Sequence, residues 1–85
     1  ELKAAAQPEL DIRGMAVDEA LPVLDNFLDA AYMGNLPNAR IIHGKGTGVL
    51  RAAVQEELRR CKYVKSFRLG VYGEGESGVT IVEFK

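Results

Sequence analysis

The sequence predicts a small α/β domain, specifically an α+β two-layer sandwich with the element order βαβαββ. Two segments with helical spacing of apolar residues each follow a short strand-like run, and two more strand-like runs close the chain. A length of 85 residues allows one hydrophobic core and not two. We therefore expect one domain at residues 8–85, with two helices covering a mixed sheet of about four strands. A linker-like tail at residues 1–7 would precede it.

The first two elements are predicted to be a strand and an amphipathic helix. Residues 9–13 alternate polar and apolar side chains and end at Gly14, as a strand bounded by a turn does. Residues 17–33 repeat apolar side chains at helical spacing, with acidic residues on the other side. Pro22 lies near the start of this helix, where its missing N–H costs at most one early hydrogen bond. Stop signals for the helix begin at Gly34.

The remaining elements are predicted from the same two periodicities. Residues 39–43 form a short apolar run, and residues 47–61 again show helical spacing. Residues 64–69 and 79–84 are typical of strands, and the segment 70–78 between them is rich in Gly and Glu. Each strand–helix–strand unit requires parallel strands, which we expect to be neighbours with right-handed connections. The last two strands can pair antiparallel.

Composition disfavours several classes of protein. With 47% apolar and 27% charged residues the chain is ordinary for a globular domain, and no apolar run reaches the roughly 18 residues of a membrane span. We expect no membrane partner. The single cysteine, Cys61, cannot form an internal disulfide and lies on an apolar helix stripe, which favours an inert core role and a reducing cytoplasm. The polar start without Met suggests a fragment of a longer protein.

Charge is distributed unevenly along the chain. The formal net charge is −1, but residues 1–39 carry −5, residues 40–68 carry +6 and residues 69–85 carry −2. A basic middle third is suited to a nucleic-acid backbone. It is equally typical of the solvated face of a helix, so charge alone leaves both interpretations open.

The loop at residues 43–48 (HGKGTG) is the most informative segment. Alternating glycines let backbone N–H groups approach an anion, the following helix N-terminus supplies further donors, and Lys45 adds a mobile charge. The spacing is neither that of a Walker A loop nor that of a dinucleotide fold, so we expect no nucleotide cofactor. The alternative is a tight turn in which Thr47 caps the helix.

Three polar residues lie at the predicted carboxyl ends of the first two strands, where ligands usually bind in such sheets. Asp11 and Arg13 are expected to face His43, which would bring an acid, a base and a phosphate clamp together. A histidine with its ordinary pKa near about 6.5 suits proton transfer, although a lone histidine is also often structural. Asp11 could instead pair with Arg13 or cap the turn. Beyond Asp11 only Glu74 and Glu76 could supply further carboxylates, so we expect no metal site.

Two motifs resemble those of the Smr (small MutS-related) domain. Residues 10–14 (LDIRG) resemble its LDLR/LDLH-G signature, and residues 43–46 (HGKG) resemble its HGxG signature. The likeness continues through three later segments and covers about residues 8–85. The residues of these motifs are most similar to those of the C-terminal Smr domain of the second MutS lineage. The full chain of that lineage resembles a mismatch-repair ATPase with an added coiled coil.

This resemblance implies a sandwich similar to the C-terminal domain of a translation initiation factor. It implies binding of branched or duplex DNA, or of RNA and the ribosome, with endonucleolytic cutting in several members. Asp11 would be the catalytic acidic residue, Arg13 a phosphate or rRNA contact, and residues 43–46 a backbone clamp. Members that cleave RNA strongly often carry His in place of Arg13, so this chain lacks one possible acid–base partner for His43.

The resemblance also implies a parent protein with other domains. ATP would bind only in the ATPase domain of that parent, which would form a homodimer through those domains, and the Smr domain itself would need no cofactor. The parent would act in suppression of recombination or in rescue of collided ribosomes.

Two functions follow from these residues. In the first, an endonuclease, Asp11 or His43 activates a nucleophile while Lys45, Arg13 and the loop amides stabilise charge on the phosphate. In the second, a docking module without chemistry, the same cleft binds the backbone. The expected phosphate-binding set is Arg13, Gly44, Lys45, Gly46, Thr47, Arg51, Lys65 and Arg68, with Arg40 added for docking. Few exposed aromatic residues and no base-reading groups predict low sequence specificity.

Overall fold

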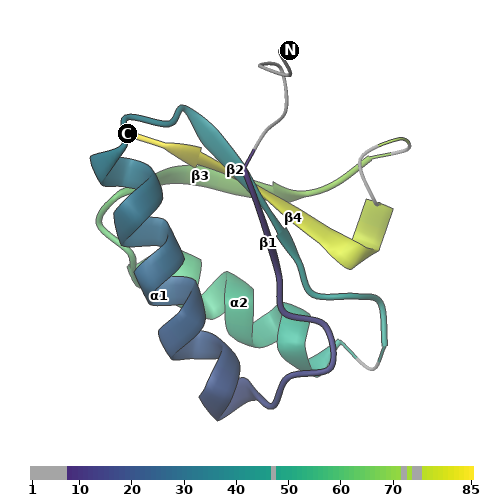
Figure 1. Cartoon of the computed structure of the whole chain (residues 1–85). Coiled ribbons are helices and arrows are strands. Elements are labelled where there is room, and N and C mark those ends of the chain that lie inside the picture. Colours follow the sequence, from purple (N-terminus) through teal and green to yellow (C-terminus); the bar gives the residue numbers. More distant parts are fainter. Residues whose placement is uncertain (1–7, 47, 72, 74–75) are drawn as a thin grey trace, which may run out of the picture.

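The computed structural model describes residues 8–46, 48–71, 73 and 76–85 (Figure 1). In chain order its elements are β1 (Glu9–Asp11), α1 (Val17–Met33), β2 (Asn38–Ile42), α2 (Val49–Arg60), β3 (Val64–Leu69), the short 3-10 helix η1 (Glu76–Gly78) and β4 (Val79–Phe84). The predicted order βαβαββ is confirmed. The expected linker at residues 1–7 lies outside the described residues. In the described ranges no helix combines the length and the apolar character needed to cross a membrane.

The sheet has the strand order β1-β2-β4-β3. β1 and β2 pair in parallel, and β4 runs antiparallel to both of its neighbours. The prediction that both strand–helix–strand units join neighbouring strands is therefore wrong for β2 and β3, which are separated by β4. The reason lies in the composition of β4, where four successive residues from Val79 to Val82 are buried. Such a strand is most stable in the interior of a sheet, where both of its edges are hydrogen-bonded and the side chains of both neighbouring strands shield its own.

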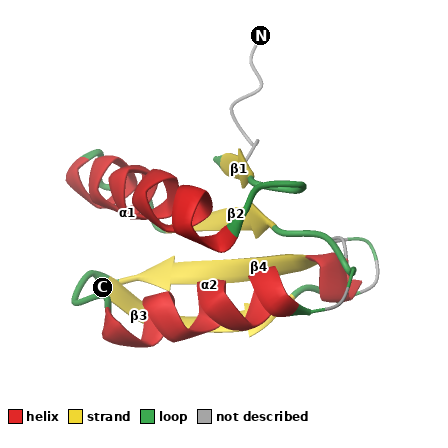
Figure 2. Ribbon diagram, turned by 90° about the horizontal axis from the view of Figure 1, so that it is seen from below, coloured by secondary structure: helices red, strands yellow, loops and turns green. Residues whose placement is uncertain are grey.

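Both helices cover one face of the sheet, as Figure 2 shows, and the core lies between these two layers. Ile41 pairs with Thr80 and Ala39 with Val82, and this set of side chains faces the helices. The other face carries the alternate residues, among which Glu9 and Arg40 form an ion pair of 3.1 Å. The predicted two-layer sandwich is thus confirmed, and within the described ranges no helix covers the other sheet face.

The C-terminus of α1 is closed by two backbone hydrogen bonds. The N–H of Asn35 donates to the carbonyl of Tyr32 at 2.9 Å, and the N–H of Leu36 donates to the carbonyl of Ala31 at 3.1 Å. This pattern requires one left-handed residue, which is Asn35 with φ 62°. The stop predicted at Gly34 is confirmed, but the left-handed position is one residue later.

The two helices meet through a pair of carboxyl groups. Burial and a side-chain hydrogen bond with Glu57 raise the pKa of Asp25 in α1 to about 6, against an ordinary value of 3.8. The hydrogen bond of Arg60 to Glu57 lowers the pKa of Glu57. As pH falls through about 6, Asp25 therefore takes up a proton before Glu57 does and donates it to the Glu57 carboxylate.

We expect Asp25→Asn to stabilise the protein at pH 7.5 and to have little effect at pH 4. Because the folded pKa of Asp25 is raised, its contribution to stability is fully present below about 3.8 and is lost as pH rises through about 6. An asparagine amide donates to Glu57 at every pH. The measurement is the melting temperature of both proteins between pH 4 and 8. Asn26→Ala is the control, because it changes a neighbouring residue of the helix that does not titrate. If the melting temperatures of wild type and Asp25→Asn changed equally with pH over this range, the pairing of Asp25 with Glu57 would be contradicted.

Candidate nucleic-acid interface

The glycine loop after β2 is fixed by a carbonyl from the other end of the chain. Gly78, just before β4, accepts hydrogen bonds from the N–H groups of His43 at 3.1 Å and Gly44 at 2.9 Å. Gly44 adopts φ 83°, a left-handed conformation that favours glycine. The amide of Gly44 is thus used inside the protein, and the predicted cradle of loop amides does not include it.

Gly44 also brings the two sequence motifs into contact. A Cβ atom at Gly44 would lie 3.3 Å from Cγ of Arg13, so the aliphatic stem of Arg13 lies directly against the loop backbone. A Cβ at Gly78 would likewise lie 3.4 Å from Cγ of Lys45. Two cationic side chains therefore lie along the glycine loop on stems that glycines allow to approach closely.

Asp11 and Arg13 form a bidentate ion pair. The guanidinium Nε and Nη2 donate to the two carboxylate oxygens at 3.0 and 2.7 Å, and the backbone N–H of Arg13 donates to the same carboxylate at 3.1 Å. These bonds lower the pKa of Asp11 to about 2, the side-chain bond having the largest effect. The side chains are 47% and 62% exposed, so the pair is open to a ligand. The alternative that Asp11 pairs with Arg13 is confirmed.

His43 is buried, with 5% of its surface exposed. Nδ1 lies 2.9 Å from the carbonyl oxygen of Gly44, which can only accept, so Nδ1 carries the proton. Nε2 lies 2.8 Å from Oγ1 of Thr80, whose hydroxyl then donates to it. Burial and the positive charge of Arg51 lower the pKa of His43, against the effect of the Gly44 bond. The ring is therefore neutral at pH 7, and both of its nitrogens have internal partners.

Asp11 and His43 lie on opposite faces of the sheet. Asp11 is in register with Ile42, and successive residues of a strand point to opposite faces. His43 follows Ile42 and faces the helices, whereas Asp11 lies on the uncovered face. The expectation that Asp11 and His43 face each other is wrong, because it depended on a register that local sequence does not reveal.

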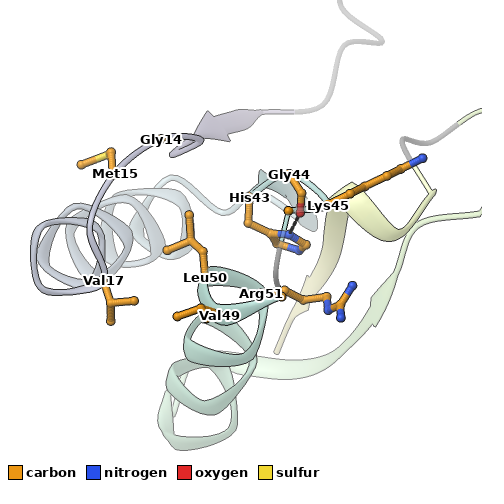
Figure 3. Close-up of a pocket in the computed structure, with 11 residues that line it drawn as sticks. Gly14, Met15, Val17, His43, Gly44, Lys45, Val49, Leu50 and Arg51 are labelled. Atoms are coloured by element: carbon orange, nitrogen blue, oxygen red, sulfur yellow. Dashed lines mark hydrogen bonds between the residues drawn. The ribbon is translucent and has the colours of Figure 1, made fainter.

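Two pockets flank the glycine loop, one on each side, and Gly44 and Lys45 line both. The helix-side pocket, of about 240 Å³, lies between the segment after β1 and the start of α2 (Figure 3). The sheet-side pocket, of about 530 Å³, lies on the uncovered face beside Arg13. The loop is therefore a ridge between two hollows, and not the floor of a single cleft.

The predicted basic residues divide into near and distant groups. Lys45 and Arg51 belong to the near group, and in Figure 3 they extend away from Met15 and Val17. Both line the helix-side pocket, as Gly46 does. The N-cap residue of α2 is Gly48, with φ 87°. Thr47, the predicted helix cap, lies outside the described residues.

The other basic residues belong to the sheet. Arg68 is in register with Ile81, near the C-terminal end of β3, and its guanidinium donates to the Leu69 carbonyl at 3.2 Å. Lys65 lies at the start of β3, at the end of the sheet away from the loop. Arg40 lies in β2 on the uncovered face, paired with Glu9. The structure thus brings Arg13, Lys45 and Arg51 together around the loop and leaves Lys65 apart.

Metal binding has no assembled site among the residues that the structure describes. No group of three His, Cys, Asp or Glu side chains suitable for an ion is present there. Glu74 and the side chain of Glu76, the additional carboxylates considered from sequence, lie outside this part of the chain.

Sequence reasoning missed two residues that build the site. Gly78 holds the loop through its carbonyl, and Thr80 holds the ring of His43. The signal for Thr80 was present, because a hydroxyl within an apolar strand needs a buried partner. Nothing local pointed to the carbonyl of Gly78, whose role depends on the pairing of β2 with β4.

Comparison with known proteins identifies relatives of the whole chain. Residues 10–85 match the Smr domain family. Endonuclease MutS2 of Lachnoclostridium phytofermentans is 59% identical over 78 residues, which are 92% of this chain and 10% of that protein. Endonuclease MutS2 of Caldanaerobacter subterraneus subsp. tengcongensis is 54% identical over 83 residues, 98% of this chain and again 10% of the relative. The chain thus spans about a tenth of the length of the curated relatives it matches.

Two solved structures share the fold. The Smr domain of Thermus thermophilus MutS2 superposes with a TM-score of 0.89 at 47% identity, covering 92% of this chain and 98% of that one. YdaL, a stand-alone small MutS-related protein from Escherichia coli, superposes with a TM-score of 0.88 at 25% identity, covering 99% of this chain and 71% of its own. Both motifs, the sheet order and these similarities agree, and the chain belongs to the Smr domain family.

Proposed function

We propose that this domain is an endonuclease module that binds the sugar–phosphate backbone of DNA or RNA along the glycine loop and cuts it beside Asp11. The observation that carries the proposal is the contact of Arg13 with both Asp11 and Gly44. It joins an acidic group and a planar cation to the loop in one exposed patch. Relatives named endonuclease MutS2 support the nuclease assignment.

Backbone binding follows from the charges around the loop. Lys45 and Arg51 line the helix-side pocket, and Arg13 and Lys45 line the sheet-side pocket, so cations border the loop on both sides. The N-terminus of the 12-residue helix α2 adds the positive end of its dipole. Among the described residues, those around the loop offer cations and backbone groups, which suit phosphates, so we propose binding with low sequence specificity.

Cutting would use Asp11 as the base, activated by the substrate itself. While Arg13 holds Asp11, the pKa of about 2 makes the carboxylate a weak base. An incoming phosphate competes for the same guanidinium, and its success releases Asp11 and raises the pKa of Asp11. Asp11 then accepts a proton from a water molecule as the water oxygen bonds to phosphorus. The bond to the leaving sugar oxygen breaks, and that oxygen takes a proton from solvent. Lys45 stabilises the charge that develops on the phosphate.

A docking module without chemistry is the second candidate. The neutral, doubly bonded His43 and the strongly acidic Asp11 favour it, because neither group takes up a proton readily in the free domain. In this alternative the same surface delivers the domain to branched DNA or ribosomal RNA. We propose further that the parent protein acts in the cytoplasm as a homodimeric ATPase in recombination suppression or ribosome rescue, with ATP and dimer sites in other domains.

The first test is nucleic-acid cutting by Asp11→Asn. We expect cutting to fall by about a hundredfold or more, because the base is lost, while binding holds or tightens as Arg13 becomes available to phosphate. Wild type and variant are compared on single-stranded RNA, duplex DNA and branched DNA, with and without chelator. Glu9→Gln is the matched control, since Glu9 lies on the same strand face and pairs with Arg40. Binding by both proteins without cutting by either would favour the docking module.

A second test compares two lysines of equal charge. Lys45→Ala should weaken binding and reduce the slope of log affinity against log salt by about 1, because one phosphate contact is lost. Lys65→Ala removes the same charge at the other end of the sheet and should leave the slope unchanged. Fluorescence anisotropy titrations over a range of salt concentrations measure both. Equal effects of the two substitutions would locate binding elsewhere than the loop.

The chain has one histidine, so nitrogen-15 NMR of the imidazole reports His43 without ambiguity. We expect the neutral Nδ1–H tautomer from pH 8 down to pH 6.5, because burial lowers the pKa of His43 and both nitrogens are hydrogen-bonded. Accordingly, the pH profile of any cutting should show no histidine ionisation near pH 6.5. A ring that titrates there and exchanges tautomers would return His43 to the role of proton carrier.

A further inference from the structure

We propose that the sheet-side pocket holds the base and ribose of an unpaired nucleotide next to the bound phosphate, so that the substrate is a single strand or an unpaired stretch. This inference rests on the backbone binding proposed above and deepens it. The helix-side pocket, of about 240 Å³, is less than half as large as the sheet-side pocket and lies below the roughly 300 Å³ at which small-molecule pockets begin.

The pocket combines an apolar floor with a cationic rim. Ile42 and Val79, which pair across β2 and β4, form its floor, and Arg13 and Lys45 border it. Gly44 and Gly78 also line it, and their missing side chains let the stems of Arg13 and Lys45 approach the backbone. The volume of about 530 Å³ is in the range of small-molecule sites and can take a nucleoside.

A phosphate group alone does not account for this composition. Phosphate gains nothing from contact with Ile42 and Val79, whereas a base or ribose is stabilised when it covers apolar surface. In a duplex the bases are stacked inside and only the backbone reaches a recess on a protein. An unpaired nucleotide presents both of the parts that the pocket can contact.

Arg13 adds a flat surface to the same pocket. Arg13 lines the pocket, and a guanidinium that binds phosphate through its edge still presents its plane to a nucleobase. The charges of the rim also select the occupant. An apolar peptide would cover the floor but would offer no anion to Arg13 and Lys45, whereas a nucleotide offers an anion and an apolar surface together.

The experiment uses three probes with the intact protein: an oligothymidylate, a fully abasic strand of the same length, and a DNA duplex. The abasic strand carries the same phosphates, so any difference in affinity reports the bases. The variants are Ile42→Ala, which removes part of the floor, and Lys45→Ala. Ile81→Ala is the matched control, because Ile81 lies on the same sheet face and does not line the pocket. Anisotropy gives affinities, and circular dichroism melting verifies folding.

We expect wild type to bind oligothymidylate about fivefold or more tighter than the abasic strand, and tighter than the duplex. Ile42→Ala should remove this preference and weaken binding of the abasic strand much less than binding of oligothymidylate, whereas Ile81→Ala should retain the preference. If wild type bound the two strands equally, the pocket assignment would be overturned. This comparison does not depend on the folding of any variant. If Lys45→Ala still weakened binding, the proposed function would survive that result. If wild type showed no salt-dependent binding to any of the three probes, both the pocket assignment and the proposed function would be overturned.

Discussion

The two hydrogen bonds that the Gly78 carbonyl accepts from the loop are the constraint on which the site depends. They tie the end of β2 to the start of β4 and set the path of the chain through Gly44. The left-handed conformation of Gly44 follows, and so does the space in which the stem of Arg13 lies. Any side chain at Gly44 would meet Arg13 and would also be strained by the positive φ. Glycine is therefore required at position 44 for two reasons: the positive φ of the backbone and the close approach of the Arg13 stem.

The sheet divides the chemistry of the site between two faces. On the helix side, His43 and Thr80 bond to each other and are part of the packed interior, where a neutral imidazole is stable. On the uncovered side, Asp11 and Arg13 form an ion pair that water and ligands can reach. His43 consequently supports the loop from below through the Gly44 carbonyl, while the exposed pair is in the position to meet a substrate.

Much of the fold could be predicted from sequence because its signals are local. The bounds of α1, β3 and β4 agree with the apolar periodicities, and the LDIRG and HGKG motifs mark the two strand ends that form the site. Helical and strand periodicity each depend on neighbours within a few residues. The charge pattern likewise indicated the basic region, although it did not separate Lys45 at the loop from Lys65 at the far end of the sheet.

Only the tertiary structure decided the order of the strands and the faces of their side chains. The position of β4 between β2 and β3 depends on burial of its side chains between these neighbours, a property of the assembled sheet. The register of Asp11 against Ile42 joins segments 31 residues apart, and a shift of one residue would move every side chain to the other face. The sequence by itself thus determined which residues form the elements and motifs. Strand pairing, a long-range interaction, decided that Asp11 and His43 are separated.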